Sequence, residues 1–139
     1  MTGSTQPSCV SCSPPSHEIQ QPRGLPYPPG MRVDHGKLVR DRIPAIIESH
    51  GCRAVAHTLD EDSYRTALLA KLAEEAREAQ QATADDLPAE LADVLEVLQA
   101  LTAAFGLTWE QLQELADDKR THRGGFRQRL FLDYVDQPE

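Results

Sequence analysis

Apolar residues recur every three or four positions from residue 31 onward, which is the period of an amphipathic α-helix. Helices are expected over about residues 43–49, 60–83, 86–105 and 109–122. Pro44 is tolerated because it lies in the first turn of the first helix. Thr108 and Gln111 form a capping-box pattern before the fourth, and glycines follow the third and fourth helices. The sequence therefore predicts an all-α fold, a helical bundle of about four helices.

Each long helix carries an apolar stripe when its residues are placed on a wheel at about 100° per residue. The stripe of the second helix is Tyr64, Leu68, Leu72, Ala76 and Ala79, and that of the third is Leu91, Val94, Leu95, Leu98 and Leu101. Such helices give a thin core for a domain of about 109 residues, so we expect a homodimer or higher homo-oligomer to complete the bundle. The weakly alternating residues 53–59 predict a short extended connection. The apolar residues 127–135 are expected to pack back onto the bundle.

Carboxylates gather along one edge of these stripes. Glu75 falls inside the stripe of the second helix, Glu74 and Glu78 lie at its edge, and Glu90 and Asp93 border the stripe of the third. The connection between the two helices is short, so we expect antiparallel neighbours whose acidic edges meet. Carboxylates crowded at a half-buried seam repel one another, and a hard cation relieves that repulsion. Oxygen ligands without Cys or His favour Mg²⁺, with Mn²⁺ as an alternative, over zinc.

Basic residues form a second constellation. Lys37 and Arg40 precede the first helix, and Lys119 and Arg123 close the fourth. Cations near a helix C-terminus are expected on dipole grounds alone, but the glycine pair after Arg123 also lets backbone amides approach a phosphate. The segment around Lys37 and Arg40 is too short to be a stable helix by itself. A bound phosphate, or an ion pair to Asp41, is expected to order it.

Composition limits the partners. The 139 residues include 14 Lys+Arg and 22 Asp+Glu, for a formal charge of −8, which argues against binding a nucleic-acid polymer. No apolar run approaches the ~20 residues that span a bilayer, and the N-terminus lacks the apolar core of a signal peptide. We therefore expect no membrane partner and a cytoplasmic protein. Cys9, Cys12 and Cys52 are an odd, sparse set and no disulfide framework.

The acidic pattern resembles a known signature. Glu74-Glu75-x-x-Glu78, followed by Glu90-x-x-Asp93, is similar to the E-E-x-x-E…E-x-x-D motif of the MazG-like all-α nucleoside triphosphate pyrophosphohydrolases. The opening Lys37-Leu-Val-Arg-Asp-Arg-Ile-Pro and the closing Lys119-Arg-x-x-Arg-Gly-Gly-Phe resemble a branch of small stand-alone proteins in that superfamily. The resemblance covers about residues 33–135.

The resemblance implies Mg²⁺-dependent hydrolysis of a nucleotide between its α and β phosphates, with removal of unwanted nucleotides as one role. The metal ligands would be Glu74, Glu75, Glu78, Glu90 and Asp93. Lys71 would contact phosphate, together with the basic residues Lys37, Arg40, Lys119 and Arg123. Glu75, Glu78 and Lys71 would be catalytic, with one of the acids orienting or deprotonating the attacking water.

Other interpretations stay open. The spacing between the two acidic motifs also resembles phosphoribosyl-ATP pyrophosphohydrolase. A different class is a non-catalytic helical interaction protein, in which the carboxylates are a solvated face; for Glu96, Glu110 and Glu114 we prefer that reading. A ferritin-like di-iron protein needs Glu-x-x-His on two helices, and the chain contains none.

Residues 1–30 hold seven of the ten prolines and show no helical or strand period, so they predict a disordered tail before a domain over residues 31–139. Met31 is a plausible native start. The tail offers nothing to a core, so deletion of residues 1–30 should leave the melting temperature unchanged. Thermal unfolding of the full and shortened chains checks this. A shortened chain that is insoluble or melts far lower would contradict it.

Overall fold

The structure, a computed structural model, describes residues 30–138 and confirms the all-α prediction for them. Its helices are α1 (Ile43–Ser49), α2 (Glu61–Gln81), α3 (Leu87–Ala104) and α4 (Trp109–Arg123), and no strand forms in this part of the chain. Residues 53–59 connect α1 to α2 without regular secondary structure. The predicted disordered tail lies outside the described residues, except for Gly30.

Local side-chain interactions start α2 and α4, and the cap of α4 is the one that the sequence predicts. The Asp60 carboxylate accepts a hydrogen bond from the Ser63 backbone N–H at 2.8 Å and caps α2. Before α4, the Thr108 hydroxyl accepts from the Gln111 N–H at 3.2 Å, and the Gln111 side chain accepts from the Thr108 N–H at 2.9 Å. This reciprocal pair satisfies two backbone donors that the helix cannot use itself. Gly124, with φ 80°, ends α4 in a conformation that favours glycine.

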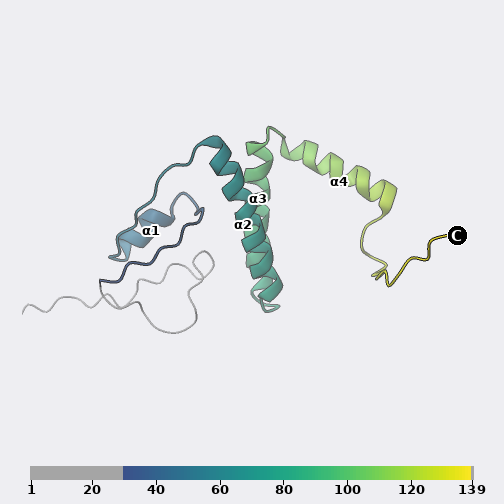
Figure 1. Ribbon diagram of the computed structural model, residues 1–139, viewed down its shortest axis with the longest axis horizontal. Coiled ribbons are helices and arrows are strands. Elements are labelled where there is room, and N and C mark those ends of the chain that lie inside the picture. The colour runs from purple at the N-terminus through teal and green to yellow at the C-terminus, as the bar shows by residue number, and fades with distance from the viewer. Residues whose placement is uncertain (1–29, 139) are drawn as a thin grey trace, which may run out of the picture. The chain divides into compact units, whose positions relative to one another are not determined.

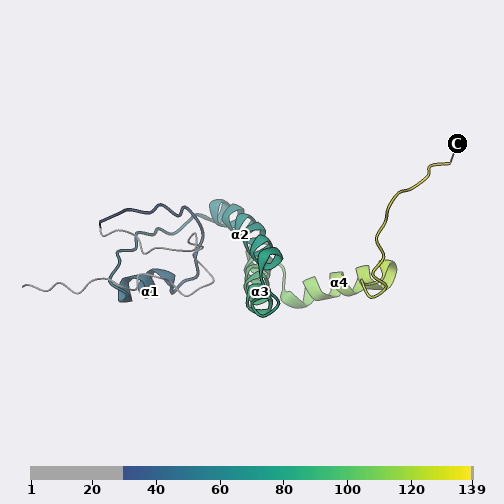
Figure 2. The same cartoon turned by 90° about the horizontal axis from the view of Figure 1, so that it is seen from below.

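The chain divides into two units after Leu101. In the first unit, α2 and α3 run side by side and antiparallel, as expected from their short connection (Figures 1 and 2). The second unit holds the end of α3, α4 and the C-terminal segment.

The apolar core of the described residues is small and consists of Ile43, Leu68, Val97 and Leu101. The predicted stripe of α3 is partly wrong: Leu91 and Leu95 are exposed, whereas Val97 is buried. The helix is turned so that Glu90, rather than these leucines, is buried. The acidic edge of α3 therefore faces inward, and less apolar surface is buried than the helical wheel predicts. The exposed leucines of α3 are left free to contact another surface.

The C-terminal segment finds no apolar surface within its own unit. Phe126 is 98% exposed, Phe131 87% and Tyr134 77%. The packing of residues 127–135 onto the bundle stays a prediction. No residue of α4 is buried either. The glycine pair at 124–125 separates α4 from this segment, and nothing in the second unit covers it.

Two further observations concern the described residues. No single helix is long and apolar enough to cross a membrane, whereas α3 and α4 taken together meet the length and composition test. Cys52 is disulfide-bonded, and the other cysteines of the chain, Cys9 and Cys12, lie outside the described residues. The full chain and the chain without residues 1–30 are therefore unfolded under reducing conditions, in which no disulfide bond contributes to either melting temperature.

Two adjacent leucines of α2 test the core. Leu68 is 3% exposed and Leu69 is 53% exposed. Leu68→Ala should lower the free energy of unfolding by about 2–4 kcal/mol, because it removes buried methyl groups and leaves a cavity. Leu69→Ala should cost about 1 kcal/mol or less. Denaturant unfolding of both variants measures the difference, and equal losses would remove Leu68 from the core.

Candidate metal and phosphate site

The buried face of α2 is charged. Leu68, Lys71, Glu75 and Glu78 are its buried residues, and their spacing of three and four places them on one side of the helix. Glu75, at 1% exposed, is the most deeply buried side chain of the described residues. This confirms the prediction that Glu75 lies on the apolar side of its helix.

Lys71 balances part of this charge. Its Nζ lies 2.6 Å from Oε1 of Glu75 and 3.5 Å from Oε2 of Glu74. The other oxygen of Glu75, Oε2, is buried and has no hydrogen-bond partner among residues 30–138. A buried carboxylate oxygen in this state costs free energy unless a further positive group reaches it.

Glu90 and Asp93 of α3 complete an acidic cluster with Glu75. One carboxylate oxygen from each of the three lies within 4.8 Å of the others, and all three side chains are largely buried. The predicted meeting of the two acidic edges is therefore observed. Three oxygens so placed match the donor set of a hard divalent cation.

The segment before α1 brings two more cations to the cluster. Lys37 Nζ lies 2.6 Å from Glu74 Oε1, and Arg40 forms an ion pair with Asp93. These contacts join residues that are 37 and 53 positions apart in the sequence, so they hold the segment against α2 and α3. An ion pair was expected to order this segment, but its partners are Glu74 and Asp93 rather than Asp41.

The charges of the cluster do not cancel. When all groups are ionised, five carboxylates (Glu74, Glu75, Glu78, Glu90 and Asp93) face three cations (Lys37, Arg40 and Lys71), which leaves a formal charge of −2. One divalent cation carries the complementary charge. The imbalance distinguishes this seam from an ordinary network of paired ions.

The crowding of carboxylates in the cluster shifts the pKa values of its members. Burial, together with the charges of neighbouring carboxylates, raises the pKa of Glu78 to about 7. Burial acts in the same direction on Glu74, but the hydrogen bond from Lys37 and the charge of Lys71 outweigh it and lower the pKa of Glu74. For Lys71, burial opposes the charged form, but the contacts with Glu75 and the nearby carboxylates raise its pKa. Lys71 therefore stays protonated at neutral pH.

A hollow of about 260 Å³ adjoins the cluster, with Lys71, Glu75 and Asp93 on one side. Its apolar lining includes Leu68, Val97 and Ala100, and Tyr64 adds an aromatic ring. Tyr64 belongs to the predicted apolar stripe of the second helix, and no role in the site was predicted for it. Tyr64, Leu68 and Lys71 follow one another at helical spacing, which is the signal that would have connected them.

The structure brings together eight of the ten predicted site residues. They are Lys37, Arg40, Lys71, Glu74, Glu75, Glu78, Glu90 and Asp93. Lys119 and Arg123 lie on α4 in the second unit and are exposed. They are not among the residues that the first unit assembles.

Comparison with known proteins adds one partial match. The chain is 54% identical over 39 residues to an uncharacterized protein of Mycolicibacterium smegmatis. The match covers 28% of this chain, and the chain spans 40% of that relative's length. No family model matches the chain, and no solved structure matches it.

The raised pKa of Glu78 predicts a pH-dependent stability in metal-free buffer. A carboxyl group with a higher pKa in the folded state binds its proton more tightly there, so its contribution is full below the ordinary value of 4.5 and is lost as pH rises through about 7. Glu78→Gln mimics the protonated form. The variant should therefore gain stability over the wild type as pH rises from about 5 to about 8.

Thermal unfolding in EDTA across that pH range measures the gain, with the exposed Glu110→Gln as the matched control. A difference between wild type and Glu78→Gln that stays constant with pH would contradict the prediction.

Proposed function

We propose that the protein is a divalent-metal-dependent pyrophosphohydrolase of nucleoside triphosphates or related nucleotides, of the MazG-like all-α type. It hydrolyses its substrate between the α and β phosphates and releases the monophosphate and pyrophosphate. The observation that carries the proposal is the buried acidic cluster at the α2–α3 seam, whose charge exceeds that of its three cations.

The residues present fit a magnesium ion. Glu75, Glu90 and Asp93 offer three oxygens within 4.8 Å of one another, and Oε2 of Glu75 is buried without a hydrogen-bond partner among the described residues. The set contains no nitrogen or sulfur donor, so Mg²⁺ or Mn²⁺ suits it better than zinc. Glu74 and Glu78 are not members of this group of three, but they add negative charge next to it: Glu74 pairs with Lys71 at 3.5 Å, and the charges of Glu75 and Glu90 act on Glu78. When bound, the metal neutralises phosphate charge and activates water.

The cations of the site are suited to hold phosphate. Lys71 stays protonated because its carboxylate neighbours raise its pKa. Lys37 and Arg40 reach the cluster from a segment without regular secondary structure, where they pair with Glu74 and Asp93. Lys and Arg form charge-assisted hydrogen bonds with phosphate oxygens as well as with carboxylate oxygens. These three residues therefore orient the triphosphate against the acidic cluster.

Glu78 is suited to proton transfer. In the metal-free protein, burial and the neighbouring carboxylates raise the pKa of Glu78 to about 7, which makes its carboxylate a stronger base than that of an ordinary glutamate. It accepts the proton of the attacking water in this proposal, while Lys71 holds negative charge on the phosphate. The adjoining hollow of about 260 Å³, with its apolar lining, gives room to part of the nucleoside.

A panel of nucleoside triphosphates with Mg²⁺ tests the function, with pyrophosphate and orthophosphate measured separately. Release of pyrophosphate is expected, and orthophosphate alone would mean cleavage at the γ position and would contradict the proposal. Activity on phosphoribosyl-ATP but on no ordinary nucleotide would identify that pyrophosphohydrolase instead. No activity, with a melting temperature insensitive to Mg²⁺ and nucleotide, would favour the non-catalytic interaction protein.

Glu75→Gln is the decisive variant. It keeps the shape of the side chain but removes a charge and a ligand, so hydrolysis should fall a hundredfold or more, on the order of 3 kcal/mol of transition-state stabilisation. In EDTA the variant should melt below the wild type, because Lys71 loses the partner at 2.6 Å. The Mg²⁺-induced rise in melting temperature should disappear.

Glu110→Gln, which removes an exposed carboxylate outside the first unit, should behave as the wild type. A Glu75→Gln variant that melts lower in EDTA yet retains full hydrolysis would remove Glu75 from the site and leave it a structural role.

A further inference from the structure

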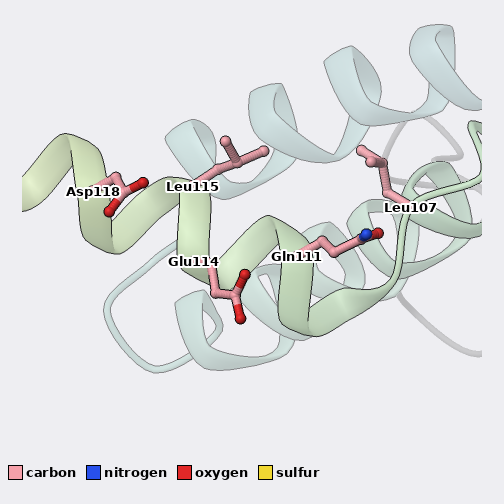
Figure 3. Close-up of a pocket in the computed structure, with 5 residues that line it drawn as sticks. All are labelled: Leu107, Gln111, Glu114, Leu115 and Asp118. Carbon is pink, nitrogen blue, oxygen red and sulfur yellow. The ribbon is translucent and has the colours of Figure 1, made fainter.

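A second hollow lies wholly within the second unit, on α4 and the residue pair before it. Its volume is about 290 Å³, and it is lined by Leu107, Gln111, Glu114, Leu115 and Asp118 (Figure 3). Within residues 30–138, the side-chain ion pair of α4 joins Asp117 to Arg120 and does not involve Glu114 or Asp118. The hollow therefore carries two carboxylates, Glu114 and Asp118, with Leu115 between them along the helix and Leu107 at the end nearest the start of α4 (Figure 3).

The C-terminal segment has the complementary character. Residues 126–132 contain Arg127 and Arg129 and no acidic residue. Their apolar members, among them Leu130 at 85% and Phe131 at 87% exposed, are not covered by the rest of the second unit. One unit thus exposes an acidic and apolar hollow together with a basic and apolar segment, and both surfaces are open.

The spacing of the charges matches as well. Glu114 and Asp118 are one helical turn apart, so their side chains emerge about 6 Å from each other along the axis. Arg127 and Arg129 alternate in sequence, so in an extended segment they point to one side about 6.6 Å apart. If Arg127 faces Asp118 and Arg129 faces Glu114, the next residue on that side is Phe131. It then points toward Leu107, while Leu115 lies beside the two arginines.

We propose that residues 126–132 of a second copy of this chain bind the α4 hollow in extended form, and that two copies exchange these segments reciprocally. The occupant is identified by complementary charge, matched spacing and apolar side chains that suit Leu107 and Leu115. The inference concerns the second unit alone and does not depend on the proposed hydrolase activity. A reciprocal exchange closes the assembly with the same contact used twice.

The chain's own segment cannot reach this register. Asp118 lies five residues before Arg123, which places it about 7.5 Å back along the axis and about 140° around the helix. A segment packed on α4 lies about 8–10 Å from the axis, so the straight-line path from Arg123 is about 13 Å and passes through the helix itself. The four residue steps to Arg127 span at most about 14 Å when fully extended. They leave no length for going around the helix and reversing direction.

The backbone of the segment favours the exchange. Arg129 has a φ of 55°, the only positive value among the described residues other than glycine, and its N–H donates to the Phe126 carbonyl at 3.1 Å in a turn. This conformation is unfavourable for a residue with a β-carbon. Extension on binding relieves it.

A charge-swap experiment tests the exchange in the full chain. The hollow variant E114K/D118K and the segment variant R127E/R129E should each weaken self-association at least tenfold, because like charges then face each other. An equimolar mixture should regain the wild-type mass, since each variant's hollow then fits the other's segment. A chain carrying all four substitutions should associate by itself. D133K/D136K, which changes charges beyond the docking segment, is the matched control and should behave as the wild type.

Sedimentation equilibrium measures the masses, and far-UV circular dichroism reports whether each variant keeps its helices. A peptide of residues 126–132 supplies a measurement free of mutation: in excess it should reduce the wild-type mass by half. A wild-type chain that is monomeric at tens of micromolar overturns the proposal, as does a mass unaffected by the peptide. Folded variants that do not reassociate when mixed, while the fourfold variant stays monomeric, would indicate binding within one chain instead.

Discussion

The buried face of α2 is built around an ion pair within that helix that has almost no access to water. Lys71 and Glu75 meet at 2.6 Å, with side chains that are 7% and 1% exposed. Withdrawing two such charges from water costs several kcal/mol for each ion, and their attraction offsets this only when further polar contacts support it. Glu74 supplies one such contact for Lys71 at 3.5 Å. The negative charge that remains on the cluster explains why a divalent cation would stabilise the fold as well as serve a reaction.

Much of the site could be predicted from the sequence because it lies on regular helices. A helical wheel places Glu75 among apolar residues and Glu90 and Asp93 on one side of a second helix, and a short connection makes the two helices neighbours. Capping is similarly local, so Thr108 and Gln111 could be assigned from their spacing. The partners of Lys37 and Arg40 could not, since contacts across 37 and 53 residues depend on tertiary packing.

The orientation of α3 about its own axis could not be predicted from the sequence either, for a physical reason. A wheel maximises apolar burial, and by that criterion Leu91 and Leu95 should be covered. In the structure, Glu90 takes the inward position because the seam is organised by charge, and the leucines are left outside. The C-terminal segment illustrates the same limit: its apolar composition predicts burial, but composition does not tell which surface, or which copy of the chain, provides it.

The capping box of α4 has a consequence for anything that binds that helix. No residue of α4 is buried, yet the helix is capped by Thr108 and Gln111 at its start, carries an ion pair between Asp117 and Arg120, and ends in basic residues that suit its dipole. Contacts between residues close in sequence thus stabilise α4, and the helix is formed before any partner binds. A ligand of α4 meets a formed surface, so the ordering entropy of association falls on the incoming segment alone, and binding resembles docking to a rigid receptor rather than joint folding.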